Sequence, residues 1–513
     1  MKYRALIFLF TMSLPSWATT YYVLPGGSGT KAGTSWSNAR CAIPDPLAAG
    51  DIVYIGNVVG QDMANTAVTA CAEPTHSFSG SGTSGAHITI KAATGADHGT
   101  ATGWSSSMGV DVNPKITWSN AWVPSNGLKA GFWTFCGSYY DFDGKVGTAD
   151  STGTYGFYLK SAGDSFGMIK GDSHDCGESS MSNINFQNVE VDGVNANSTN
   201  NDANGGSNGL YFGSPVSASA TVGPVSFTQM YIHDLMGPFS CAGNCNGVTF
   251  GNDWIETNFS SHLNHSNAID TQMPSGGFGI TNLTVYNTVF TNIVGTGVIM
   301  CLNGACDGWK IYNNIIYYTS DFDSVCQHGM STSQAVCGMS KGMGDNTPAG
   351  LITNSVFYGN TFANVHLKAG FSGADSAGIQ ITISGSSNNV VENNLWWNCT
   401  AGPITATGIT AHDYNTWLNT ALNGMSLNTH ESQTGTAPGG AAVNPFTNSF
   451  GTFTLTSETA DAHLNDGVSL SSPYNLDFAG ATRGADGTWE RGAFQFNAGN
   501  ALIPPTNLSA TVQ

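Results

Sequence analysis

Apolar residues in this chain come in short runs, and one arrangement of them returns several times. Two short β-prone runs meet at a polar hinge residue, which is usually asparagine. The clearest copies span residues 285–290, 311–316, 356–362 and 390–396, and looser copies span 186–189 and 231–235. Asparagine tolerates the left-handed backbone conformation that a sharp bend requires. Each copy therefore predicts two short strands joined by a tight bend.

The copies are separated by unequal intervals. A constant unit with variable spacing indicates coils of one solenoid, with loops of different lengths inserted between them. The apolar runs are short and flanked by turn residues, and no stretch has the pattern of a long amphipathic helix. We therefore predict an all-β solenoid. The long intervals at 189–231, 235–285 and 316–356 are where functional loops are expected.

Composition agrees with a folded chain that carries few charges. Of 513 residues only 10% are charged, against roughly 25% in an average domain. The 12 Trp, 26 Phe and 17 Tyr residues are too many for a disordered chain. The net charge of −19 disfavours nucleic acid and anionic membranes as partners. Beyond the N-terminus no apolar run approaches ~20 residues, so we expect no membrane insertion, and we expect a monomer.

The N-terminus has the pattern of an export signal. Lys2 and Arg4 precede an apolar stretch at 5–14, and residues 16–18 (Ser-Trp-Ala) have the small-x-small pattern of a cleavage site. We expect cleavage after Ala18 and a protein that is secreted or held at the cell surface. The predicted organisation is a signal peptide at 1–18, one solenoid domain at 19–496 and a linker or tail at 497–513.

All 11 cysteines lie beyond this cleavage site, which fits an oxidising compartment. The predicted disulfides are Cys241–Cys245, Cys301–Cys306 and Cys326–Cys337, with Cys136–Cys176 and Cys41–Cys71 as looser pairings. An odd count leaves one thiol, for which Cys399 is the candidate. The pair Cys241 and Cys245 has no second Cys/His pair at ligand spacing beside it, which disfavours zinc.

The first coils and the end of the chain carry longer motifs. The first coils contain Tyr-Tyr-Val at 21–23, Gly-Asp-Ile-Val-Tyr-Ile at 50–55, Ile-Thr-Ile at 88–90 and Tyr-Asp-Phe-Asp-Gly at 140–144. The end of the chain contains Arg-Gly-Ala-Phe at 491–494. These motifs resemble the opening and closing segments of secreted proteins of the pectate-lyase-like superfamily. The resemblance implies a single-stranded right-handed parallel β-helix. It leaves the activity open, because that superfamily includes lyases, hydrolases, epimerases and non-catalytic adhesins.

Such coils bury a continuous apolar column when they stack at the ~4.8 Å strand spacing. The asparagines at the bends can then form hydrogen-bonded ladders between coils, and the first and last segments would act as caps. The positions predicted to face inward are Val285, Val289, Ile311, Ile315, Val356 and Leu395.

The richest polar segment ends at Gln272. Its last part, His265-Ser-Asn267-Ala-Ile-Asp270-Thr-Gln272, resembles a His-x-Asp-x-Ile-Gln string that faces the binding groove in β-helix enzymes, with Asn267 where the string has aspartate. We interpret His262 or His265 as a general base or sugar ligand that Asp270 orients. Asn267 and Gln272 are candidates for substrate binding. A polar turn rich in hydrogen bonds is the alternative interpretation.

Two lysines and two tryptophans extend this candidate site. Lys310 and Lys341 follow the histidine segment by one and two coils, and a lyase acting on a uronate needs a cation to neutralise the carboxylate. Solvated surface lysines are the alternative. Trp254 and Trp396 can serve as stacking platforms for sugar rings, and core packing is the alternative for them.

Three aspartates offer a metal site. Asp307, Asp321 and Asp323 flank one coil, and the last two lie two residues apart, so they can share a Ca²⁺ ion. Solvated loop acids are the alternative interpretation.

Two functions remain open from the sequence. The first is a secreted polysaccharide lyase that cleaves a uronate-containing polymer by β-elimination. The second is a non-catalytic adhesin or matrix protein that binds a surface glycan, and a glycoside hydrolase or an epimerase on the same fold is a further alternative.

Overall fold

The computed structural model describes most of the chain between Ala18 and Phe496. The described residues are 18–64, 71, 75–120, 132–148, 150, 151, 153–161, 166–172, 176, 177, 180–193, 208–213, 220–235, 237–257, 259, 260, 267–271, 279–328, 337–370, 375–456 and 463–496. The predicted signal peptide up to residue 17 and the predicted tail at 497–513 lie outside these residues.

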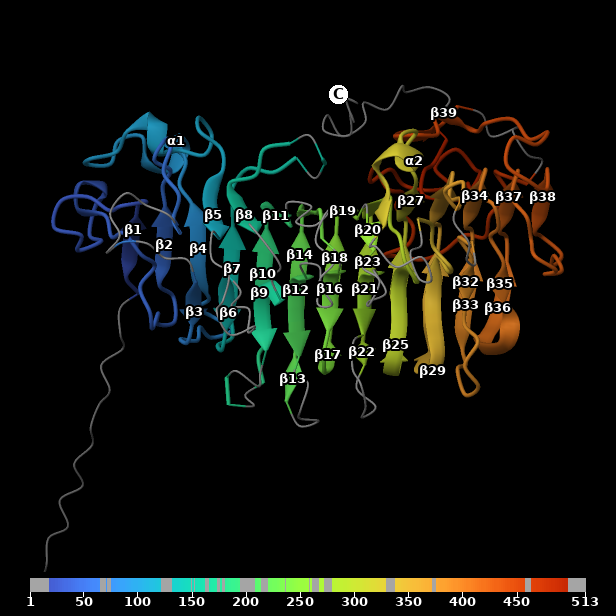
Figure 1. Cartoon of the computed structure of the whole chain (residues 1–513), viewed down its shortest axis with the longest axis horizontal. Coiled ribbons are helices and arrows are strands. Elements are labelled where there is room, and N and C mark those ends of the chain that lie inside the picture. The colour runs from blue at the N-terminus through green and yellow to red at the C-terminus, as the bar shows by residue number, and fades with distance from the viewer. Residues whose placement is uncertain are drawn as a thin grey trace, which may run out of the picture.

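Three long parallel sheets make up the fold (Figure 1). The 12-stranded sheet, called sheet 1, consists of β1 (Thr20–Val23), β2 (Ile52–Ile55), β4 (Ile88–Ala92), β7 (Tyr140–Asp143), β10 (Ile184–Gln187), β14 (Val225–Thr228), β18 (Val248–Gly251), β23 (Thr284–Tyr286), β26 (Lys310–Tyr312), β30 (Val356–Tyr358), β33 (Asn389–Glu392) and β36 (Ile409–Asp413).

The 11-stranded sheet is called sheet 2. It consists of β5 (Ile116–Asn120), β8 (Phe157–Ser161), β11 (Val189–Asp192), β15 (Tyr231–His233), β19 (Trp254–Glu256), β24 (Val289–Thr291), β27 (Ile315–Tyr317), β31 (Thr361–Ala363), β34 (Leu395–Trp397), β37 (Thr416–Leu418) and β38 (Ser432–Thr434).

The 13-stranded sheet is called sheet 3. It consists of β3 (His76–Phe78), β6 (Trp133–Phe135), β9 (Phe166–Asp172), β12 (Asn208–Gly213), β13 (Thr221–Val222), β16 (Gly237–Cys241), β17 (Asn244–Asn246), β21 (Asn267–Thr271), β22 (Ile280–Thr281), β25 (Gly297–Asp307), β29 (Met343–Thr353), β32 (Ile379–Gln380) and β35 (Ile404–Thr405).

The remaining elements are short. They are the pairs β20 (Phe259–Ser260) with β28 (Gln327–His328) and β39 (Phe446–Asn448) with β40 (Thr452–Leu455), the helices α1 (Gly95–His98) and α2 (Phe322–Val325), and 3-10 turns at Trp36–Asn38, Ser106–Met108 and Ala406–Gly408. No helix among the described residues is long and apolar enough to cross a membrane.

From β3 to β37 the chain passes through the sheets in a fixed order, from sheet 3 to sheet 1 to sheet 2. The strands β25, β26 and β27 form one coil, and β29, β30 and β31 lie beside them in the next coil. Successive coils advance along the long axis of the molecule, as the colour sequence of Figure 1 shows. The fold is a parallel β-helix, as the sequence predicts.

Apolar side chains fill the interior in files that run from coil to coil. In sheet 1, Phe142, Phe186, Phe227 and Phe250 stack with ring centroids 5.2, 5.4 and 4.9 Å apart. Offset ring pairs at this spacing add to the stabilisation from burial. In the later coils of sheet 2, the Trp396 ring lies between Phe362 and Trp417, with centroid distances of 5.2 and 4.9 Å.

The prediction of inward positions is right for sheet 1 at Val285 and Ile311, which are buried in this core and paired in register. It is wrong at Val356, which is half-buried while its neighbour Phe357 occupies the inward file. An alternating strand sends successive side chains to opposite faces, so the register of β30 decides which of the two is inside.

The prediction is also wrong for Val289, Ile315 and Leu395 in sheet 2. These side chains are buried, but they belong to a separate cluster on the outer face of that sheet. The C-terminal segment covers this face with apolar residues that include Phe453 and Phe494. Burial therefore comes from a segment that is remote in the sequence.

The bends between sheets 1 and 2 follow the predicted chemistry. Asn287, Asn313 and Asn393 have φ values of 48°, 56° and 59°, and Gly359 takes the same position with a φ of 60°. Asparagine and glycine are the residues that adopt this left-handed conformation at least cost.

The residue after each bend continues a buried ladder, which confirms the predicted asparagine stacking. The Nδ2 groups of Asn314, Asn360 and Asn394 each donate to the Oδ1 atom of the next asparagine at 3.0 Å. The last member, Asn415, donates to Glu431 Oε1 at 2.8 Å. The ladder therefore links four coils inside the protein and ends on a buried carboxylate.

The five predicted disulfides are all present, and Cys399 is the free cysteine, which is buried. In three of them the two cysteines are 4, 5 and 11 positions apart in the sequence. The other two join residues 30 and 40 positions apart in the first coils.

The closing segment lies along sheet 2, and Figure 1 shows it in orange and red beside the later coils. Buried arginines attach it. Arg483 donates to Asn313 Oδ1 at 3.0 Å, and Arg491 donates to the Asn415 carbonyl at 3.0 Å and to Asp466. This segment covers a side of the solenoid, whereas the sequence suggested a terminal cap.

Candidate functional site

Strand β21 of sheet 3 carries Asn267 and Asp270, two of the polar residues that the sequence singled out. Strand β21 starts at Asn267, its Ile269 side chain faces the core, and Asp270 faces outward by alternation. In register, Asp270 lies between Ser240 of β16 and Met300 of β25. All of these side chains are buried, and Asp270 is only 1% exposed.

Asp270 and Asn267 form one hydrogen-bonded unit. Asn267 Nδ2 donates to Asp270 Oδ2 at 2.9 Å, while Asn267 Oδ1 accepts the backbone N–H of Gly297 from the next coil at 3.1 Å. Burial raises the pKa of Asp270 to about 7, although hydrogen bonds from Asn267 and Ser240 act in the opposite direction. A carboxyl group in this range exchanges its proton near neutral pH, as acid–base catalysis requires.

The other residues of this segment lie outside the described residues. His262 and His265 fall between β20 and β21, and Gln272 directly follows β21. Their predicted roles stay predictions. The two stretches that contain them, 261–266 and 272–278, adjoin β21, the strand that carries Asp270.

The two candidate lysines belong to different sheets. Lys310 begins β26 in sheet 1, where it is exposed and lies in register between Thr284 and Val356. It therefore does not share the outer face of sheet 3. Lys341 lies two residues before β29 of sheet 3, and its backbone N–H donates to the Thr296 carbonyl at 2.8 Å.

The ammonium group of Lys341 is held within its own coil. Lys341 Nζ lies 3.6 Å from Asp345 Oδ1 and also donates to the Asp345 carbonyl. Thr296, whose carbonyl accepts from Lys341, is followed by Gly297, and the N–H of Gly297 donates to Asn267 Oδ1. Of the two lysines, only Lys341 lies next to a strand of the sheet that carries Asp270.

The candidate tryptophans are buried. Trp396 is 0% exposed inside the aromatic stack of sheet 2, and Trp254 is 4% exposed on the outer face of that sheet, where its Nε1 donates to Thr291. Neither ring offers a face to solvent in this structure. Core packing accounts for both.

The three candidate calcium ligands occupy separate places. Asp307 ends β25 and accepts hydrogen bonds from Thr353 and Asn354, which lower its pKa. Asp321 precedes α2, and Asp323 within α2 lies 3.1 Å from His366 Nε2. They are not part of the one group of three metal-ligating side chains found within the described ranges. Calcium binding here stays a prediction.

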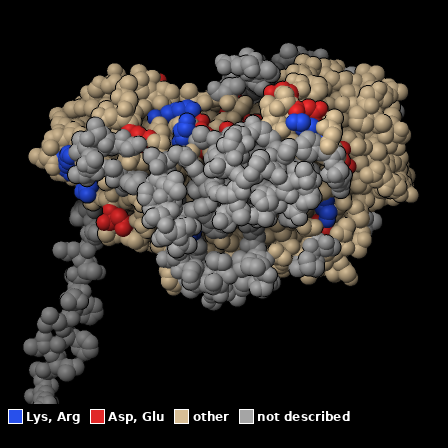
Figure 2. All heavy atoms as spheres, viewed as in Figure 1, with Lys and Arg blue, Asp and Glu red and all other residues tan. Residues whose placement is uncertain are grey.

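Sequence reasoning missed a charged cluster on the outer face of sheet 2. Lys115, before β5, contacts Glu190 Oε2 at 2.8 Å and lies 4.4 Å from the centre of the Tyr158 ring. Tyr158 in turn donates its hydroxyl hydrogen bond to Asp192. Charged residues are sparse on the visible described surface, and they stand in a few separate groups (Figure 2).

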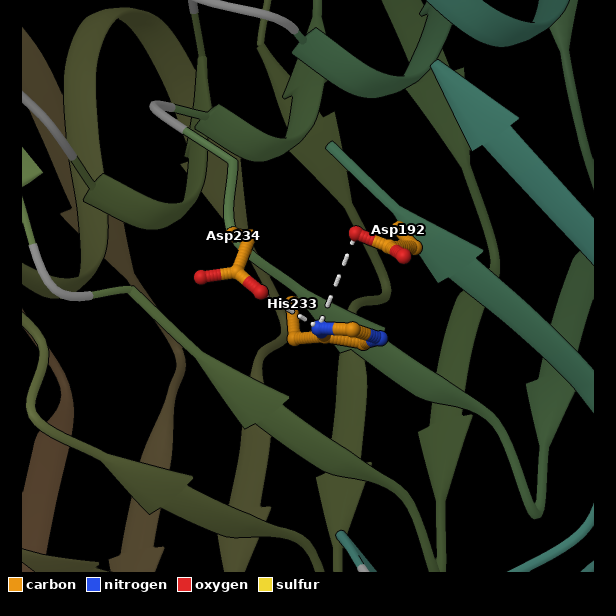
Figure 3. A group of neighbouring side chains, drawn as sticks. All are labelled: Asp192, His233 and Asp234. Atoms are coloured by element: carbon orange, nitrogen blue, oxygen red, sulfur yellow. Dashed lines mark hydrogen bonds and ion pairs between the residues drawn. The ribbon is translucent and has the colours of Figure 1, made fainter. Parts of the chain in front are cut away.

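His233 is the centre of this cluster. Its Nδ1 atom lies 2.9 Å from Asp234 Oδ2 and 3.9 Å from Asp192 Oδ1 (Figure 3). Its Nε2 atom lies 3.4 Å from Glu190 Oε1. Burial alone would lower the pKa of His233, but the hydrogen bonds to Asp234 and Glu190 and the nearby Asp192 raise it to about 10.

The signal for this cluster lies at the two looser copies of the repeated unit, at 231–235 and in the residues that directly follow 186–189. Glu190 and Asp192 alternate with buried valines in β11, and Tyr231 and His233 flank a buried isoleucine in β15. Stacking the two copies in register pairs Asp192 with His233.

Comparison with known proteins adds no relative. No protein-family model matches the chain, and no curated protein matches it. The structure therefore defines the class of this protein as a parallel β-helix, and its function has to be argued from its own residues.

Proposed function

We propose that this protein is a secreted polysaccharide lyase that cleaves a uronate-containing polysaccharide by β-elimination, with Asp270 as a proton-transfer group. The observation that carries the proposal is a buried carboxyl group on the outer face of a parallel sheet, with its pKa raised to about 7 by burial. The five disulfides and the export-signal pattern support secretion.

The proposed reaction assigns complementary tasks to the site. A base removes the C5 proton of the uronate, the bond between C4 and its oxygen breaks, and an acid protonates the leaving oxygen. Asp270 holds a proton near neutral pH and suits the acid. His262 or His265 serves as base, and Lys341 neutralises the uronate carboxylate, a charge that a bound Ca²⁺ ion would also neutralise. The resemblance to the pectate-lyase-like superfamily supports this substrate class.

The test is to incubate the protein with a panel of acidic polysaccharides, with and without Ca²⁺, and to follow the ultraviolet absorbance of the unsaturated product. Loss of a general acid typically lowers the rate by about 10²–10⁴-fold, so Asp270→Asn should reduce product formation by that factor. Glu392→Gln is the matched control, because burial also raises the pKa of this carboxyl but it lies in sheet 1. Loss of activity in both variants would contradict a specific role for Asp270.

One observation favours a second function, a non-catalytic glycan-binding protein. Asp270, Ser240 and Met300 are all buried, so the described residues leave no polar opening at this point of sheet 3. A glycan that binds to the wild-type protein and to Asp270→Asn with equal affinity, while no product forms, would favour this function. New reducing ends without an ultraviolet signal would indicate a hydrolase.

A further inference from the structure

The cluster around His233 lies on sheet 2, away from the proposed lyase site on sheet 3. Figure 3 shows the His233 ring edge between the carboxylates of Asp192 and Asp234. One ligand atom from each of the three residues lies within 4.8 Å of the others. Asp192 is buried, while His233 and Asp234 are partly buried, with 11% and 29% of their side chains exposed.

The distances between these atoms fit a common bound ion. Four ligands around a cation with bonds of about 2.0–2.1 Å lie about 3.3 Å from one another. The Nδ1 atom of His233 lies 2.9 Å from the Asp234 oxygen and 3.9 Å from the Asp192 oxygen, so the observed values bracket that spacing. Small side-chain movements would bring all three atoms to bonding distance of one ion.

Neighbouring side chains fix the direction in which the His233 ring points. Its other nitrogen, Nε2, faces Glu190 Oε1 at 3.4 Å, and Lys115 holds the Glu190 carboxylate. The Tyr231 ring stacks on the imidazole with a centroid distance of 3.9 Å and an interplanar angle of 13°. A histidine that binds a metal through one nitrogen usually has a carboxylate facing its other nitrogen, and Glu190 stands in that position here.

The carboxylate of Asp192 is also held in one orientation. Tyr158 donates its hydroxyl hydrogen bond to Asp192 Oδ2, and the Oδ1 atom of the same carboxylate is the one that faces His233. The group thus has three ligand-type atoms on one side and a set of hydrogen-bonded supports behind them.

We infer that Asp192, His233 and Asp234 bind a divalent transition-metal ion, for which Zn²⁺ is the expected representative. One imidazole nitrogen with two carboxylate oxygens is a ligand set that suits zinc or manganese, whereas Ca²⁺ and Mg²⁺ prefer oxygen ligands alone. Three protein ligands leave a coordination position for water. Because these residues lie on sheet 2, the inference does not depend on the proposed lyase activity.

A protonated His233 held by its carboxylates is the competing explanation, since it would make the same contacts without an ion. The experiment that distinguishes the two explanations is isothermal titration calorimetry of the full chain. Bound metal is first removed with a chelator, the chelator is then removed, and the protein is titrated with ZnCl₂ and, separately, with CaCl₂. We expect one equivalent of Zn²⁺ to bind to the wild type. We expect Ca²⁺ not to compete for it.

Variants then locate the ion. Asp234→Asn keeps the size of a partly exposed side chain and should weaken Zn²⁺ binding by more than tenfold, and Glu190→Gln should weaken it by about 10–100-fold through loss of ring orientation. The matched control is Asp413→Asn, because Asp413 lies 2.8 Å from His430 Nδ1 in a His–Asp pair that is not part of this group. Its affinity should equal that of the wild type.

Two results would overturn the inference. One is a wild-type protein that takes up no Zn²⁺ at submillimolar concentration. The other is Asp234→Asn protein that binds Zn²⁺ like the wild type, which would assign the ion to another place. X-ray absorption at the zinc edge of the loaded wild type needs no variant, and a ligand shell without imidazole nitrogen would also refute the site.

Discussion

Replacing Asp270 with asparagine is expected to stabilise the protein above neutral pH and to change its stability little in acid. Burial raises the pKa of Asp270 from 3.8 to about 7. The folded protein therefore keeps this proton up to about pH 7, whereas the unfolded chain releases it near pH 4. Because the folded state binds more protons in this window, the free energy of unfolding falls as pH rises from about 4 to about 7.

The size of the effect follows from the shift. One pKa unit corresponds to 1.36 kcal/mol, so a shift of about three units corresponds to about 4 kcal/mol of stability lost above pH 7. Asparagine has the same shape and carries no charge at any of these pH values. Its amide oxygen can still accept the hydrogen bond that Asn267 donates in the wild type. The variant should therefore escape most of the pH-dependent loss.

Urea unfolding of the oxidised protein at pH 5 and at pH 8 measures this. Because only the two pH units between 5 and 7 fall inside the window, the wild type should lose about 3 kcal/mol more than Asp270→Asn between the two pH values. Asp321→Asn, at an exposed carboxylate, is the control and should follow the wild type. Parallel losses for the wild type and Asp270→Asn would refute the argument that burial keeps Asp270 protonated.

Three other predictions concern the solenoid. Asn360→Ala removes four buried hydrogen bonds of the ladder and should lower the free energy of unfolding by about 4 kcal/mol in the same urea assay. The control is Asn246→Ala at an exposed contact between coils, which should lower the free energy of unfolding by under about 1 kcal/mol. Arg491→Met should lower the free energy of unfolding by about 3 kcal/mol and expose the outer face of sheet 2 to limited proteolysis. Unchanged cleavage would argue against the attachment of the C-terminal segment through Arg491. Burial raises the pKa of Cys399 to about 12, so iodoacetamide should label it only after unfolding, and labelling of the native protein would contradict its burial.

The sequence predicted what depends on local chemistry. The left-handed bend at Asn287 and the ladder through Asn314 and Asn360 follow from asparagine and from the repeat itself. The disulfides were also predictable, because three of the pairs are close in sequence.

The outward burial of Val289 and Leu395 was not predictable, because the residues that cover them come from the C-terminal segment. A repeated apolar position signals burial, and it does not say on which face. The same limit hid the cluster around His233. Asp192 and His233 become neighbours only through the register of β11 and β15, which are separated in the chain by β12, β13 and β14.

Of the candidate site, the sequence identified the strand and the residue whose pKa is shifted, Asp270. It misjudged the surroundings of Trp396, because only the stacking of coils shows that this ring lies between two other aromatic rings. Lys310 was placed near the site by coil number alone. Its strand belongs to sheet 1, so its position along the solenoid does not bring it to the face of Asp270.

The pH dependence of unsaturated-product formation tests the central proposal most directly. With an acidic polysaccharide that the wild type cleaves, the rate should fall as pH rises through about 7, because the acid form of Asp270 is lost. Asp270→Asn should lower the rate by about 10²–10⁴-fold and remove this limb of the profile. Equal rates and the same profile in the variant, or no ultraviolet signal with any acidic polysaccharide in the presence or absence of Ca²⁺, would contradict the proposal.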